Sequence, residues 1–228
     1  MRKRYPYSEM NTVKTITMLL VTTAILTSSA HAQGFLNLNF ESAQNLPGNP
    51  GAYGMSVSVI DALPDWTASA GPNTLSSIYY VSNSFPGVSS SVELEGGSLA
   101  LGGNNLSVGL FDGGSISQTG LVPNNAESLQ FEAYITGPAN FFSVTLGGQK
   151  LSYSALSEGA GYTVYGANIP ADMDGQTEAL AFSSGDNSLL DNIEFSSMSV
   201  PEPSLFALVG LGALLLGLRR LRREIIRS

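Results

Sequence analysis

The stretch "SLQFEAYI" at residues 128–135 decides the fold class of this chain of 228 residues. Apolar and polar side chains alternate along it, and this period of two is typical of a β-strand with one buried face. Other stretches with the same alternation lie on both sides of it, at residues 35–41, 55–60, 91–95, 106–111, 141–146, 162–169, 178–184 and 189–198.

Segments rich in turn-forming residues separate these stretches, for example "GGNN" at 102–105 and "SSGDN" at 183–187. Outside the two ends of the chain, no window has apolar residues at helical spacing over three turns. About nine to eleven strands spaced in this way predict an all-β fold, an antiparallel β-sandwich of jelly-roll type, over residues 33–199. A short flexible segment at 196–204 is expected to follow this single domain.

Basic residues lie almost entirely at the two ends of the chain. Of the 10 Lys and Arg, four lie in residues 1–14 and five in residues 219–228, and the whole chain has a net charge of -8. Between residues 33 and 200 one basic residue, Lys150, stands against 15 acidic residues, so this region has a net charge of -14. Such a region does not neutralise phosphates, so nucleic acid is not expected as a partner, whereas divalent cations and neutral glycans are compatible with it.

The chemistry of residues 33–200 is limited by the side chains that are missing. The chain has no cysteine, and its one histidine, His31, lies in the N-terminal segment. Without these residues, a Ser-His-Asp triad, a Cys-His pair and the usual zinc ligand sets are all excluded from the region. We therefore expect a protein that is not an enzyme.

The N-terminal segment has the features of a secretory signal peptide. A basic start precedes the apolar stretch "TITMLLVTTAIL" at 15–26, and a small-x-small pattern at 30–32 follows it. This order predicts a signal peptide at 1–32 that is cleaved between Ala32 and Gln33. An N-terminal amphipathic helix is the alternative, but the apolar stretch has no polar face.

The C-terminal segment combines a proline motif, an apolar run and a basic cluster. Residues 205–218 carry no charge and would span about 21 Å as a helix, which is short for a membrane core of about 30 Å. The following residues extend the apolar run, and the arginines predict a cytoplasmic C-terminus. A buried core helix is the alternative, but it would need partners on all faces of a helix that ends in arginines.

In this order, Pro201, Glu202 and Pro203, the short span, and the cluster Arg219, Arg220, Arg222 and Arg223 resemble the PEP-CTERM sorting segment. The resemblance covers residues 200–224, leaves 225–228 as a tail, and implies an exosortase, an integral-membrane cysteine peptidase, as partner. It also implies processing at or near the proline motif. The protein would then be exported, held transiently in the inner membrane by a single hydrophobic helix, and released to the cell surface or extracellular matrix.

The body also resembles uncharacterised ectodomains of PEP-CTERM proteins. The similarity lies in "NFE" at 39–41, "PDW" at 64–66, "SISQT" at 115–119 and "LDNIEF" at 190–195. The opening and closing patterns are similar to galactose-binding-like jelly rolls and related carbohydrate-binding modules. This resemblance implies a structural calcium ion held by Glu41 and Asp191, for which the alternative is two solvated carboxylates at a sheet edge.

Two acidic pairs give a different candidate chemistry. Glu93 and Glu95 lie two apart and point to the same face of a strand, and Asp172 and Asp174 lie in the acidic stretch "DMDGQTE". Two carboxylates suffice for glycoside hydrolysis, so a glycan-active hydrolase is one alternative function. The simpler interpretations are a solvated strand face for the glutamates and an acidic turn for the aspartates, because the second stretch lacks the spacing of an EF-hand.

Aromatic side chains supply the candidate ligand-binding residues. Trp66, Tyr79 and Tyr80 could stack on sugar rings if they are exposed, although a single tryptophan in a sandwich also suits the core. The expected function is an exported surface or matrix protein whose body binds or associates with exopolysaccharide. A purely structural matrix protein without a defined ligand is the other alternative.

Overall fold

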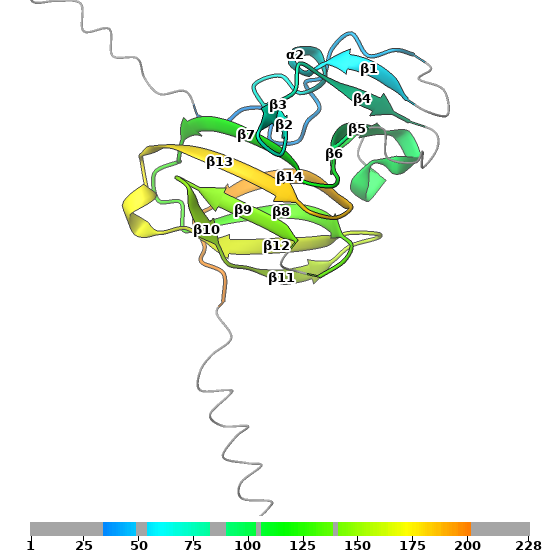
Figure 1. Cartoon of the computed structure of the whole chain (residues 1–228). Helices are drawn as coiled ribbons and strands as arrows, with labels where there is room; N and C mark the ends of the chain where they lie inside the picture. Colours follow the sequence, from blue (N-terminus) through cyan, green and yellow to red (C-terminus); the bar gives the residue numbers. More distant parts are fainter. Residues whose placement is uncertain (1–33, 49–53, 83–89, 104–105, 139–140, 202–228) are drawn as a thin grey trace, which may run out of the picture. The chain divides into compact units, whose positions relative to one another are not determined.

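A computed structural model describes residues 34–48, 54–82, 90–103, 106–138 and 141–201, which form two β-sheets (Figure 1). The predicted signal peptide at 1–32, its cleavage site, the apolar span and the arginine cluster lie outside the described residues. Of the proline motif, only Pro201 is described. No helix in the described ranges is long and apolar enough to cross a membrane.

The larger sheet has eight strands and the smaller one six. The larger sheet contains, in spatial order, β1 (Met55–Ser58), β4 (Ser77–Val81), β5 (Val92–Gly96), β6 (Leu106–Leu110), β14 (Ser188–Ser196), β8 (Ser128–Ile135), β12 (Thr163–Asn168) and β11 (Tyr153–Glu158). The smaller sheet contains β10 (Gln149–Leu151), β9 (Phe142–Leu146), β13 (Thr177–Ser184), β7 (Gly114–Leu121), β2 (Thr67–Ala70) and β3 (Asn73–Thr74). The helical elements are α2 (Val59–Ala62), η1 (Gly97–Leu99), η2 (Leu101–Gly103) and η3 (Ala171–Met173).

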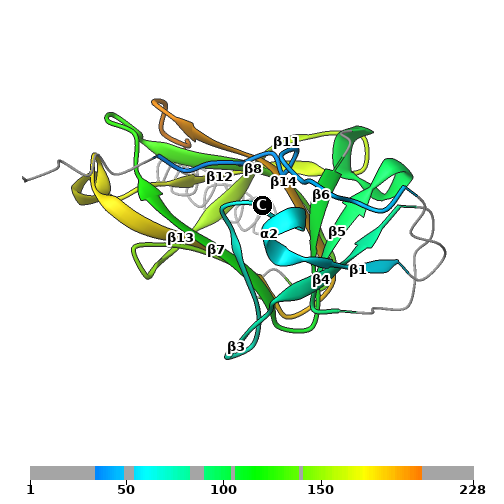
Figure 2. The same cartoon turned by 90° about the horizontal axis from the view of Figure 1, so that it is seen from above.

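The two sheets face each other, and the all-β sandwich predicted from the alternation is confirmed (Figure 2). Among the described residues, β4 and β5 depart from the antiparallel expectation and run parallel, and the isolated bridge between Gly34 and Leu121 is parallel as well. Residues 59 and 60, expected to end the strand at 55–60, belong instead to the helical turn α2, and the strand β1 ends at Ser58.

Aromatic rings from both sheets form the centre of the core. Phe131 of β8 lies against Phe142 of β9 and Phe182 of β13, with ring centroids 5.8 and 5.4 Å away. Tyr153 and Tyr165 pack on the same ring at 5.7 Å each. The alternation in β8 therefore works as predicted, with Phe131 fully buried between two partly exposed neighbours.

The segment at 35–41 was predicted as a strand, and this prediction is wrong. Asn37 and Phe40 have φ angles of 48° and 56°, a left-handed conformation that interrupts any ladder. The segment is held by Gln118 of β7 instead. Its Oε1 accepts a hydrogen bond from the amide of Leu36 (2.6 Å), and its Nε2 donates to the carbonyl groups of Leu36 (3.0 Å) and Asp65 (2.9 Å).

All four motifs of the body resemblance meet around this segment. Phe40 of "NFE" packs against Trp66 of "PDW" at 5.6 Å between ring centroids. Gln118 belongs to "SISQT", and the amide of Ile193, in "LDNIEF", donates to the carbonyl of Leu38 at 3.0 Å. The described contacts of these motifs therefore join the two ends of the body to each other.

Candidate functional site

The three predicted aromatic ligand-binding residues are not gathered in one site. Trp66 is 5% exposed and its Nε1 donates to the carbonyl of Asn37 at 3.0 Å, so the indole belongs to the core and is not an exposed stacking surface. Tyr79 and Tyr80 are half-buried in β4 and, as neighbours in a strand, point to opposite faces. The prediction of Trp66 as a ligand-binding residue is therefore corrected.

The predicted calcium ligands lie in different environments. Glu41 is exposed, and its Oε1 accepts a hydrogen bond from the amide of Leu106 at 3.0 Å. Asp191 is fully buried in β14, and its Oδ1 accepts from the amide of Asn192 at 2.7 Å. The described residues contain no cluster of three or more acidic, histidine or cysteine side chains that could hold a metal, and calcium at Glu41 and Asp191 stays a prediction.

Glu93 and Glu95 of β5 do not lie on a solvated strand face, and that interpretation is wrong. They are 2% and 5% exposed. Burial, then the charge and a hydrogen bond of Glu93, raise the pKa of Glu95 from 4.5 to about 8. Oε1 of Glu93 accepts from the amide of Ser90 at 3.0 Å, whereas Oε2 of Glu95 has no hydrogen-bond partner in the described part of the chain. One proton on Glu95 therefore lowers the cost of burying two carboxyl groups side by side.

The second acidic pair forms the turn that the sequence indicates. Asp172 lies in η3 and Asp174 follows it, and both are exposed. Oδ1 of Asp174 accepts a hydrogen bond from the amide of Asn125 at 2.6 Å, which ties the turn to a neighbouring loop.

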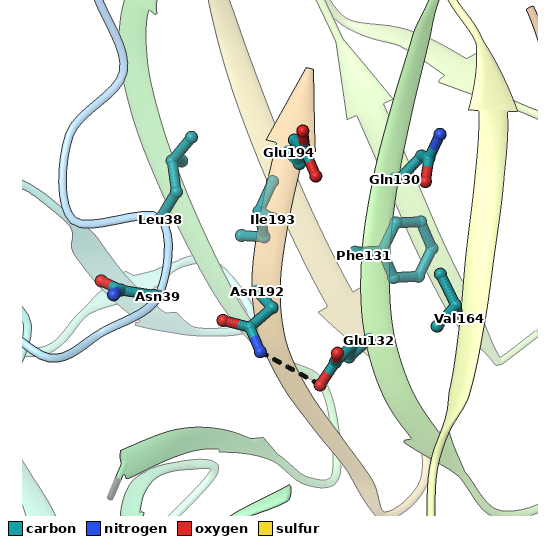
Figure 3. A pocket seen from close by; sticks show the side chains of 9 residues that line it. All are labelled: Leu38, Asn39, Gln130, Phe131, Glu132, Val164, Asn192, Ile193 and Glu194. Carbon is teal, nitrogen blue, oxygen red and sulfur yellow. Dashed lines mark hydrogen bonds between the residues drawn. The ribbon is translucent and has the colours of Figure 1, made fainter. Parts of the chain in front are cut away.

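The strongest candidate site lies on the larger sheet, where β14 and β8 meet the segment at 35–41 (Figure 3). An open pocket of about 470 Å³ lies there, and we call it the polar pocket. Its polar lining consists of Asn39, Gln130, Glu132, Asn192 and Glu194. Leu38 and Val164 add apolar surface at its edges.

A β-bulge in β14 determines the geometry of the polar pocket. The register of β14 against β8 shifts between Asp191 and Glu194, and Asn192 within this bulge has a φ of 45°. Nδ2 of Asn192 donates to Oε2 of Glu132 at 3.1 Å, across the two strands (Figure 3). This contact holds a carboxylate and an amide side by side and leaves other oxygen and nitrogen atoms of the lining for a ligand.

A second pocket of about 280 Å³ opens further along β8, where β8 lies beside β12. It is lined by Tyr134 and Tyr162 together with Glu158, and we call it the tyrosine pocket. Tyr134 is 48% exposed. A Cβ atom on Gly102 would lie 3.3 Å from Oε2 of Glu132 and 3.1 Å from the ring of Tyr162, so η2 lies next to both pockets.

The polar pocket was not predicted as a site, although Asn39, Asn192 and Glu194 belong to the motifs of the body resemblance. A signal existed, because the alternation that buries Phe131 places Gln130, Glu132 and Tyr134 on the other face of β8. The partners across the strands depend on the register between β8, β12 and β14 and on the bulge at Asn192, and neither follows from one sequence.

The arrangement offers hydrogen-bond acceptors and amide groups together with the exposed ring of Tyr134 and the half-buried ring of Tyr162. These groups suit a polyhydroxylated ligand, because hydroxyl groups need acceptors and donors while the apolar face of a sugar ring packs on aromatic surface. Comparison with known protein families and with curated proteins finds no family model and no curated protein that matches this chain.

Proposed function

We propose that this protein is exported, sorted to the cell surface or extracellular matrix by an exosortase acting on residues 200–224, and associates with exopolysaccharide through its body at 33–199. The sorting part rests on the order of the signal peptide, Pro201, Glu202 and Pro203, the apolar span and the arginine cluster. The binding part rests on one observation, the polar pocket beside the tyrosine pocket on β8 and β12.

The charge of the body narrows the class of glycan. With a net charge of -14 over residues 33–200, the body repels an anionic polysaccharide unless divalent cations lie between them. Glu132 and Glu194 place part of this charge in the polar pocket itself. A neutral polysaccharide is therefore the preferred ligand, bound with its hydroxyl groups at the polar pocket and a ring face against Tyr134. The jelly-roll topology of carbohydrate-binding modules is part of this proposal.

Co-sedimentation with exopolysaccharide from the producing cells tests the binding part. We expect saturable retention of the mature protein, weakened about tenfold by Tyr134→Ala, since an aromatic contact contributes up to about 1.5 kcal/mol. Phe141→Ala is the matched control, because Phe141 is similarly exposed (44%) but lies beside β9 in the smaller sheet. Glu132→Gln keeps an acceptor for Asn192 and removes the charge.

The outcomes separate the three functions considered. Equal retention of wild type and Tyr134→Ala would contradict the proposed binding site at Tyr134. No retention with either calcium or chelator would favour a structural matrix protein without a defined ligand. Shortening of the polysaccharide by the wild type would favour the hydrolase. Retention lost in chelator would make Glu41→Gln and Asp191→Asn the next variants. Mature protein that retains residues 219–228 would contradict the sorting part.

A further inference from the structure

The chain does not leave the sandwich at the end of β14. The carbonyl of Ser196 accepts a hydrogen bond from the amide of Glu127 at 2.8 Å. Oγ of Ser128 donates to the carbonyl of Met198 at 2.7 Å. In contrast to the flexible segment expected at 196–204, the residues that precede Pro201 therefore stay on the larger sheet and pass from β14 across the end of β8 to β12.

Asn168, at the end of β12, binds both backbone groups of Val200. Its Oδ1 accepts a hydrogen bond from the amide of Val200 at 2.6 Å, and its Nδ2 donates to the carbonyl of Val200 at 3.2 Å. A carboxamide with one donor and one acceptor thus takes the place that the peptide group of a neighbouring strand would have. Pro201 has no N–H group, so the amide of Val200 is the last backbone donor before Glu202.

The side chain of Val200 is held as well. Val200 is only 9% exposed. A Cβ atom on Gly166 of β12 would lie 2.7 Å from Cγ2 of Val200 and 2.8 Å from Cδ1 of Leu156. Because Gly166 has no side chain, the side chain of Val200 fills the space above it. Gly166 pairs with Gln130 of β8, so Val200 lies on the same face of the larger sheet as the side chain of Gln130.

We propose that Gly166 and Asn168 form a binding site for extended backbone, which we call the tail latch, and that the chain's own Val200 occupies this site. A peptidase that acts at residues 201–203 must then first displace Val200 from the tail latch. The inference rests on the proposed sorting function. An extended peptide is recognised through its backbone N–H and C=O groups, and both groups of Val200 are already bound by Asn168.

The latch also links processing to folding. Val200 is held by β12, and the segment before it is held by residues of β8 and the loop before it. The site is complete only when these strands have paired. A folded body therefore slows removal of the tail, and release of Val200 speeds it.

Hydrogen exchange at the amide of Val200 tests whether the latch exists. The full chain, made in cells without exosortase and purified in detergent micelles, is compared with Asn168→Ala and with Gly166→Ala, which fills the space of the Val200 side chain. We expect about tenfold faster exchange at Val200 in Asn168→Ala, with core amides of β8 unchanged. Asn73→Ala in β3, an exposed asparagine of the smaller sheet, is the control. Equal exchange at Val200 in wild type and Asn168→Ala, with an intact core, would overturn the proposal.

The rate of tail removal tests what the latch does. In pulse-chase experiments in cells that contain exosortase, Asn168→Ala should lose its tail several-fold faster than wild type and Asn73→Ala at the wild-type rate. Faster exchange at Val200 with an unchanged processing rate would refute the gating role. If wild type itself keeps its tail, the sorting proposal and the gating role both fall, while the exchange data still decide whether Val200 is latched.

Discussion

Two strands of the larger sheet, β5 and β8, both carry glutamate, yet the glutamates of the two strands lie in opposite environments. Glu132 of β8 is partly exposed and lines the polar pocket, whereas Glu93 and Glu95 of β5 are buried. On the neighbouring strand β6, a Cβ atom on Gly109 would lie 2.5 Å from the ring of Phe111 and 3.3 Å from Oε1 of Glu95. The alternation therefore tells which residues share a face, and the surrounding chain decides whether that face is covered.

The largest effect separates the two faces of β8. Phe131→Ala should lower the free energy of unfolding by about 3–5 kcal/mol, because the ring lies among four other aromatic rings in the core. Gln130→Ala, one residue earlier on the outer face, should change it by less than about 0.5 kcal/mol. Denaturant unfolding of both variants measures the difference, and similar losses would mean that the face of the polar pocket is itself part of the core.

A smaller effect, the change of stability with pH, distinguishes the buried glutamates of β5 from the partly exposed Glu132 of β8. The pKa of Glu95 is raised to about 8 in the folded protein, so the folded state binds a proton more tightly than the unfolded chain. This contribution is fully present below about pH 4.5, and it falls by up to a few kcal/mol as the pH rises through 8.

Glu95→Gln should remove this dependence, because glutamine stays neutral and can still donate to Glu93. Thermal melting between pH 4.5 and 9 is the measurement, with Gln130→Ala as a control that should keep the wild-type profile. A Glu95→Gln variant that is no more stable than wild type at pH 9 would show that Glu95 does not hold the proton.

The smallest effect concerns the bulge that gives β8 its pocket. Asn192→Val should lower stability by about 1–3 kcal/mol, because a β-branched residue is strained at a φ of 45° and the hydrogen bond to Glu132 is lost. Asn192→Gly loses the same hydrogen bond without the strain, so it should cost about 1 kcal/mol or less. Chemical denaturation measures both variants. If Asn192→Val and Asn192→Gly lower the free energy of unfolding equally, Asn192 stabilises the bulge only through the hydrogen bond of its side chain.

The alternation of side chains was enough to predict β6, β8, β9, β12, β13 and β14. Each of these strands contributes side chains to the hydrophobic core, and this burial produces the pattern. It was misleading at residues 35–41, where the pattern is that of a strand but Gln118 and Trp66 bind the backbone in a turn. It also left the polar pocket and the latch unseen, since both depend on pairs such as Glu132 with Asn192 and Asn168 with Val200 that only the register brings together.

The contacts of the segment at 35–41 have a consequence for the order of folding. Leu38 is among the first described residues to leave the ribosome, and its carbonyl is bound by Ile193 in the last strand. Phe40, with a φ of 56°, is likewise fully buried and packs against Trp66. Contacts between residues so distant in sequence raise the contact order and slow folding. The chain therefore completes its native fold only after nearly the whole body has been synthesised. Until then, the body stays unfolded and can be bound by any protein that recognises unfolded chains.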